Sequence, residues 1–198
     1  MGMSFDRFAG WASILAGVAG LGYAVAFVVL KDGQLSAQFL TLAPLFAVAG
    51  LVAVFERVRS IDSGYATLAL ALGAFGSLAA SSHGVYDLSN ALHPPVAALA
   101  TDVPSALDPR GYGTFALTGL AVLILAGLAG RTPDLPRWVS PLGLALGIFL
   151  VLTFLARLVV LDATSVLVLL PALVSGLLSP IFFLLLGAWL LGWRRSAG

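Results

Sequence analysis

The chain has 198 residues, of which 60% are hydrophobic and only 10% are charged, and its formal net charge is +1. A soluble domain carries roughly a quarter charged residues, so this composition predicts lipid as the main solvent. The near-neutral charge predicts no nucleic-acid partner. The absence of cysteine excludes disulfides, thiolate metal sites and thiol nucleophiles.

Six apolar runs are long enough to cross a bilayer, which takes about 20 residues of helix. In chain order they are Gly10–Leu30, Ala37–Phe55, Tyr65–Leu92, Tyr112–Gly130, Trp138–Leu161 and Val166–Trp193. The first run is too long for a typical signal peptide, so we expect it to be retained. The sequence therefore predicts an all-α fold. It is a single transmembrane domain over residues 1–198, an integral membrane bundle of six transmembrane helices.

Basic residues are distributed unevenly between the two ends of the predicted bundle. With six spans, seven arginines share the side of the two termini, whereas Lys31, Arg110 and Arg157 belong to the other side. By the positive-inside rule, we expect both termini to be cytoplasmic. The Arg-, Ala- and Leu-rich composition is typical of a high-GC bacterial genome, so we expect a multi-pass protein of the bacterial inner membrane.

Small residues and prolines indicate how the helices pack. Small residues recur at four-residue spacing in the first, third and fifth runs, at Ala12, Ala16, Gly20 and Ala24, at Ala69, Gly73 and Ser77, and at Gly143 and Gly147. Such rows let helix backbones approach closely in lipid, so the sequence predicts a compact bundle. Pro171 and Pro180 predict kinks in the last helix.

The third loop, about residues 93–111, is rich in proline and too apolar for a free linker. Such a segment is typical of a short helix at the lipid surface or of a lid folded over a bundle. We expect it to lie on the outer side.

Polar residues of the third run form the candidate binding site. His83, Asp87 and Asn90 follow one another at i, i+4 and i+7, on one helical face. His83 lies 20 residues beyond Ser63, and Arg157 lies 20 residues beyond Arg137, so both are expected about 30 Å from the same boundary. The sequence predicts a polar pocket near the outer leaflet, built from His83, Asp87, Asn90 and Arg157 with an Asp87–Arg157 pair.

Simpler interpretations of these residues remain open. Asp87 and Arg157 could tie helix ends or reach the headgroups, because arginine snorkels readily. A metal site would need a third ligand such as His93, which abuts a proline break, and haem would require histidines on facing helices. The sequence shows no nucleophile–base arrangement and no phosphate-binding loop, so we predict no catalytic residue, no metal site and no cofactor.

The run Leu135-Pro136-Arg137-Trp138-Val139-Ser140-Pro141-Leu142-Gly143 resembles the entry into the fifth helix of an uncharacterised bacterial family of six-transmembrane-helix proteins, a domain of unknown function. The segment Arg7-Phe8-Ala9-Gly10 before the first helix is similar to that family as well. The resemblance implies a six-helix layout and carries no established activity.

These observations favour a non-enzymatic binding or accessory protein that holds a lipid or a small apolar ligand near the outer leaflet. A membrane-embedded enzyme that modifies a lipid, with His83 and Asp87 as its acid–base pair or as metal ligands, is one alternative. A small-solute or proton-coupled transporter is another. The expected partners are the lipid bilayer and that ligand, and the sequence leaves open a homo-oligomer or a membrane partner.

Overall fold

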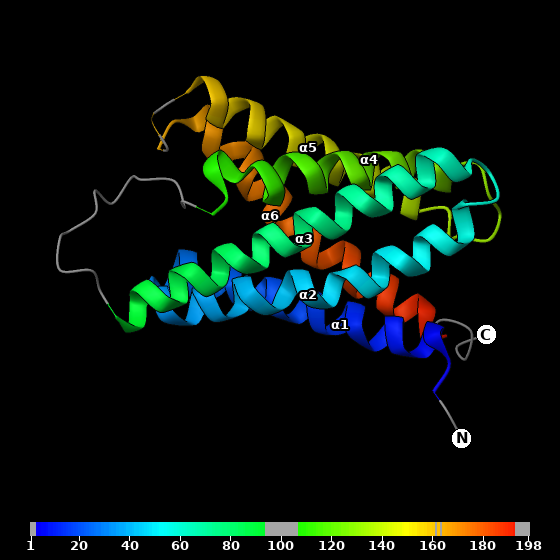
Figure 1. Ribbon diagram of the computed structural model, residues 1–198, viewed down its shortest axis with the longest axis horizontal. Helices are drawn as coiled ribbons and strands as arrows, with labels where there is room; N and C mark the ends of the chain where they lie inside the picture. The colour runs from blue at the N-terminus through cyan, green and yellow to red at the C-terminus, as the bar shows by residue number, and fades with distance from the viewer. Residues whose placement is uncertain (1–2, 94–106, 161, 163, 193–198) are drawn as a thin grey trace.

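The computed structural model describes residues 3–93, 107–160, 162 and 164–192, and within these ranges all regular structure is helical (Figure 1). The helices are α1 (Phe5–Ala24), α2 (Gly33–Val58), α3 (Ser63–Leu92), α4 (Thr118–Ala129), α5 (Val139–Val159) and α6 (Val166–Leu190). A π-helical turn, η1 (Val25–Leu30), continues α1, and a 3-10 turn, η2 (Pro109–Gly111), leads into a second π-helical turn, η3 (Tyr112–Leu117), at the start of α4.

Six helical segments are long and apolar enough to cross a membrane, which confirms the predicted integral membrane bundle. Several of them begin earlier than the apolar runs because polar side chains cap their first turns. The backbone N–H of Leu35 donates to the Asp32 carboxylate at 2.9 Å, and that of Tyr65 donates to Asp62 at 3.1 Å. The helices therefore extend beyond the hydrocarbon segments that hydropathy alone defines.

The helices form a closed ring in chain order, since each packs on its sequence neighbours and α1 packs on α6. The start of α1 and the end of α6 lie at one end of the bundle, which we call the N/C end, and η1, α3 and α5 all end at the opposite end, which we call the far end (Figure 1). The odd-numbered helices are not adjacent: α1 lies between α2 and α6, α3 between α2 and α4, and α5 between α4 and α6.

Close helix contacts at small residues confirm the packing that the sequence predicts. A Cβ added to Gly143 would lie 2.7 Å from the Cβ of Ala126, and one added to Gly147 would lie 2.9 Å from the backbone oxygen of Gly119, so α5 sits directly on α4. On the other side of the ring, Gly20 faces the ring of Pro180. Helix α6 continues through both Pro171 and Pro180, and both prolines are buried.

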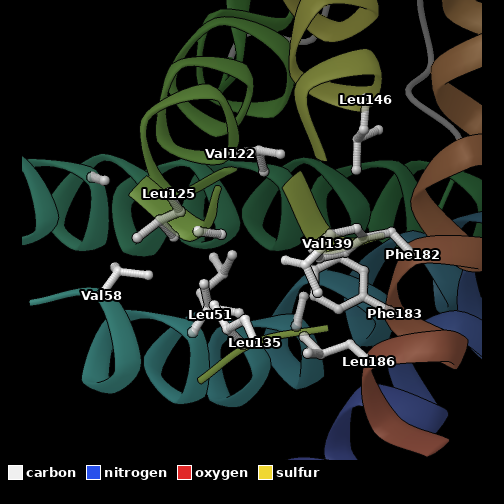
Figure 2. Close-up of a cluster of buried hydrophobic side chains, with 14 of the residues drawn as sticks. Leu51, Val58, Val122, Leu125, Leu135, Val139, Leu146, Phe182, Phe183 and Leu186 are labelled. Atoms are coloured by element: carbon white, nitrogen blue, oxygen red, sulfur yellow. The ribbon is translucent and has the colours of Figure 1, made fainter. Parts of the chain in front are cut away.

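The ring is filled with apolar side chains over its N/C half. Figure 2 shows this cluster, to which α2, α4, α5, α6 and the α4–α5 loop contribute. Its members include Leu51, Val58, Val122, Leu125, Leu135, Val139, Leu146, Phe182, Phe183 and Leu186. A void of about 10 Å³ lies among seven of the apolar residues and leaves room for no more than a single water.

Arg57 ties three helices together at the N/C end. Its guanidinium donates to the carboxylate of Asp6 at 2.9 Å and to the backbone oxygen of Ala53 at 2.8 Å. It also lies over the ring of Trp189, 5.0 Å from the centroid. One side chain of α2 therefore joins the first turn of α1 to the last turns of α6.

Most of the predicted outer lid lies outside the described residues. Its first residue, His93, caps the end of α3, and in its last part the backbone turns through Arg110 (φ 57°) and Gly111 (φ 74°). Both residues have left-handed conformations, so the chain reverses direction sharply just before η3.

Candidate functional site

The far end of α3 carries an ion-pairing couple. The Nε2 atom of His83 lies 3.0 Å from the Oδ2 atom of Asp87, one helical turn further on. The two side chains are 23% and 41% exposed, so they stand at the edge of the packed region and not deep within it. Asn90 follows on the same face and is partly buried. The helical spacing that the sequence suggested thus produces a real contact between His83 and Asp87.

Arg157 approaches the same region from the last turns of α5. Its guanidinium lies over the ring of Phe115, 5.5 Å from the centroid, and the residue is partly buried. A cation over an aromatic face is attracted by the ring quadrupole, and the attraction grows when water is excluded. Phe115 therefore helps hold a positive charge at the far end of the bundle.

Tyr23 connects the two charged elements. This residue lies on α1, and its phenol is near both Asp87 and Arg157. Because α1, α3 and α5 are not neighbours in the ring, these three side chains approach one another from separate helices. The far end therefore gathers a phenol, a carboxylate and a guanidinium, in contrast to the apolar filling of the N/C half.

Local structure explains how these side chains are positioned. Tyr23 lies two residues before the start of η1, and its ring stacks on Phe27 of that turn with a centroid distance of 5.5 Å. Phe115 belongs to η3. The two π-helical turns thus lie at the same end of the molecule. One of them, η3, contributes Phe115, and the other, η1, follows Tyr23. A π-helical turn inserts an extra residue into a helix, and such turns occur frequently at functional sites.

A buried carboxylate fixes the start of η3. Asp108 is 2% exposed, and its Oδ1 atom accepts the backbone N–H of Gly113 at 2.7 Å. Its Oδ2 atom accepts the backbone N–H of Thr114 at 3.0 Å and the Thr114 hydroxyl at 2.5 Å. Two of these hydrogen bonds satisfy N–H groups that a helix start leaves free, and all three hold the turn that presents Phe115 to Arg157.

Of the four predicted site residues, His83 and Asp87 contact each other directly. Arg157 lies near Tyr23, and Asp87 lies near the same tyrosine. The direct Asp87–Arg157 pair and the role of Asn90 stay predictions. Sequence reasoning missed Tyr23 and Phe115. A depth estimate could have found Tyr23, because it lies 16 residues beyond Arg7, or about 24 Å of helix. No sequence signal marks Phe115 as the partner of a cation.

Among the described residues, no group of three or more His, Asp or Glu side chains is placed to share a metal ion. The chemistry that the site offers is therefore hydrogen bonding and charge: a phenol, an imidazole, a carboxylate and a guanidinium. No protein-family profile, no curated protein and no solved structure matches this chain. What the protein does must accordingly be argued from the site itself.

Proposed function

We propose that the protein is a membrane-embedded binding or accessory protein, which holds a lipid or a small, largely apolar ligand through the polar cluster at its far end. We define the far-end cluster as Tyr23, His83, Asp87, Asn90 and Arg157. The observation that carries the proposal is the 3.0 Å contact between His83 and Asp87 on α3, with Tyr23 of α1 near Asp87 and Arg157 of α5 at the same end of the bundle. Few polar groups among apolar walls are typical of small-molecule sites.

The two ends of the cluster differ in charge, which suits an amphipathic ligand. Arg157 offers donors to a carboxylate, phosphate or carbonyl oxygen, and Asp87 offers an acceptor to a hydroxyl or amine. The surrounding surface is apolar, because α6 exposes Leu167, Leu170 and Leu173 at the same end of the bundle. Acyl or isoprenoid chains could lie along this surface while a polar group engages the cluster.

The apolar packing of the N/C half favours a binding protein rather than a transporter. A transporter places its site near the midplane and needs a route to both sides. Here the ring interior below the cluster is occupied by Leu51, Val122 and Phe182 and their neighbours, and no charged side chain belongs to that buried cluster. The His83–Asp87 contact favours the second candidate, a lipid-modifying enzyme, because an imidazole hydrogen-bonded to a carboxylate is a common acid–base unit.

We further propose that the N/C end is cytoplasmic in a bacterial inner membrane. Arg7, Arg57, Arg59, Arg131 and Arg137 all belong to helix ends or loops at the N/C end, whereas the far end carries Lys31, Arg110 and Arg157. An excess of arginine in short loops is the usual mark of the cytoplasmic side. The far-end cluster would then face the outer leaflet.

Native mass spectrometry of the full chain in neutral detergent, with elemental analysis of the same sample, tests the binding proposal. We expect a stoichiometric small molecule on the wild-type protein, lost in the Asp87→Asn and Arg157→Gln variants. Glu56→Gln is the matched control, since Glu56 is an exposed carboxylate paired with Arg59 at the opposite end. A bare wild-type polypeptide would contradict the proposal, and stoichiometric metal would favour the enzyme.

A further inference from the structure

A depression at the N/C end is unrelated to the far-end cluster. It encloses about 580 Å³ and lies beside the loop that joins α4 to α5. Its lining combines small, apolar and basic residues: Ala129, Gly130, Arg131, Thr132, Pro133, Leu135, Arg137 and Ser140. No carboxylate lines it, although Asp134 belongs to the same loop.

The loop around the depression is held in place from both sides. Leu135 is 6% exposed and belongs to the buried apolar cluster, so it anchors the middle of the loop in the bundle. At its ends, the backbone N–H of Arg131 donates to the oxygen of Leu128 at 2.9 Å, and that of Val139 donates to Pro136 at 3.0 Å. The floor and rim of the depression are therefore preorganised.

Ser140 and Gly130 form one wall. A Cβ added to Gly130 would lie 2.9 Å from the Ser140 hydroxyl oxygen, so the two residues face each other across the loop ends. Ser140 also lies in the first turn of α5, whose N-cap residue Trp138 provides no side-chain hydrogen bond. The Ser140 hydroxyl adds a neutral donor next to the two arginines.

Arg131 and Arg137 differ from other arginines at the same end. Arg57 pairs with Asp6 and Arg59 pairs with Glu56. Across the part of the chain that the structure describes, neither Arg131 nor Arg137 lies within ion-pair distance of a carboxylate, and both are exposed. Two guanidinium groups on one depression without a counter-charge are suited to bind an anion, and phosphate oxygens match the guanidinium fork.

We propose that this depression binds a phosphate group, and specifically the phosphate of an anionic membrane lipid. The loop follows the last apolar turn of α4 and precedes the first turn of α5, which places it at the level of the lipid headgroups. Basic depressions between transmembrane helices bind the headgroups of such lipids. The exposed face of α5 below it carries Leu144, Ile148 and Leu152, along which acyl chains can lie.

A titration by native mass spectrometry tests the proposal on the full chain in neutral detergent. Phosphatidylglycerol is the probe, and phosphatidylcholine is the zwitterionic comparison. We expect the Arg131→Gln/Arg137→Gln double variant to bind phosphatidylglycerol about 30-fold more weakly than wild type, since each arginine near anionic lipid contributes about fivefold. Each single variant should lose about fivefold.

Arg7→Gln/Arg59→Gln is the matched control, because it removes the same charge from two exposed arginines of the same end. It should bind phosphatidylglycerol as tightly as wild type. Equal thermal melting of the two double variants and wild type in detergent will show that both variants fold.

Competition with inorganic phosphate separates the two sources of the anion. Retention of phosphatidylglycerol in excess phosphate supports a lipid headgroup site, and its displacement by phosphate supports a phosphate site that takes the free ion. Unchanged lipid affinity in the Arg131/Arg137 double variant would overturn the proposal. An equal loss in the control variant would overturn it too, because it would show general attraction to the basic end.

Discussion

The two halves of the ring are built from the same six helices but are filled with opposite chemistry. In the N/C half, regular α-helices enclose apolar side chains. These extend from Val58, the last residue of α2, to Leu146 within α5 (Figure 2). In the far half, two π-helical turns and the left-handed residues Lys31 and Arg110 interrupt the regular backbone, and polar groups from α1, α3 and α5 act on one another.

Under the proposed function, this difference assigns stability mainly to the N/C half and ligand binding mainly to the far half. Departures from ideal local structure are costly, and proteins concentrate them at functional sites. Here the departures, the polar interior and the aromatic–cation contact of Phe115 with Arg157 all occur in one half. We therefore expect substitutions in the N/C half to change mainly the free energy of unfolding, and substitutions in the far-end cluster to change mainly ligand binding.

The largest expected effect is that of Phe182→Ala. Phe182 is 4% exposed and stacks edge-on against both Trp138 and Phe183, so truncation leaves a cavity in the N/C half. We expect the free energy of unfolding to fall by about 3–4 kcal/mol. Denaturant titration in mixed micelles measures it, with the 57% exposed Leu177→Ala of the same helix as control. Equal losses in both variants would break the comparison between the halves.

The second largest loss of stability should come from Gly187→Ala, because the added methyl group would push α6 away from α1. A Cβ at this position would lie 2.6 Å from the backbone oxygen of Gly10 and 2.8 Å from the backbone nitrogen of Ile14, and neither atom can move independently of α1. We expect a loss of about 2–3 kcal/mol. Gly176→Ala is the control on the same helix, since no atom lies within 4 Å of its added Cβ. A Gly187→Ala protein as stable as the control would show that the α1–α6 contact is loose.

Asp108→Ala tests the far half of the ring, where we expect a substitution to affect ligand binding as well as stability. It removes three hydrogen bonds at the start of η3, and we expect a cost of about 2 kcal/mol. Asp32→Ala, which removes one cap hydrogen bond on an exposed helix start, should cost about 1 kcal/mol. The Asp108 variant should also weaken ligand binding, because η3 carries Phe115. Unchanged ligand retention in native mass spectra would show that this turn does not position the site.

Ser13→Ala should have the smallest effect. Its hydroxyl is fully buried and, among the described residues, has no hydrogen-bond partner. Replacing an unsatisfied buried hydroxyl with a methyl group removes a desolvation cost, so we expect a change between zero and about 1 kcal/mol of stabilisation. Thermal melting in detergent measures it. A clear loss of stability would mean that the hydroxyl has a partner that matters.

The fold could be predicted from the sequence because lipid leaves few choices to the backbone. A run such as Ala37–Phe55 can satisfy its N–H and C=O groups in a bilayer only by forming a helix, so hydropathy alone locates six spans. The rows of small residues also predicted close helix contacts, which the structure has at Gly143 and Gly147. Ring closure between α1 and α6 could not be predicted, because the small residues of α1 indicate a close contact but not which helix makes it.

The candidate site could be predicted only where it lies within one helix. The i, i+4 spacing placed His83 next to Asp87, and counting residues placed Arg157 at a similar level. The contributions of Tyr23 and Phe115 depend on which helices face each other across the ring and on the π-helical turns beside them. Apolar sequences encode neither feature visibly, since a tyrosine near a helix end is also a common interfacial anchor.

The closure of the ring by α1 and α6 sets an order of events during synthesis. Gly10 and Gly17 of α1 are shaped to receive Leu191 and Leu184, residues that are translated long after them. At ribosomal rates of about 5–20 residues per second, α1 waits in the membrane for roughly 10–30 s before its partner exists. Throughout that interval its small-residue face is open to lipid or to another helix. Truncated chains that lack α6 should therefore be prime substrates for membrane proteases and insertion chaperones.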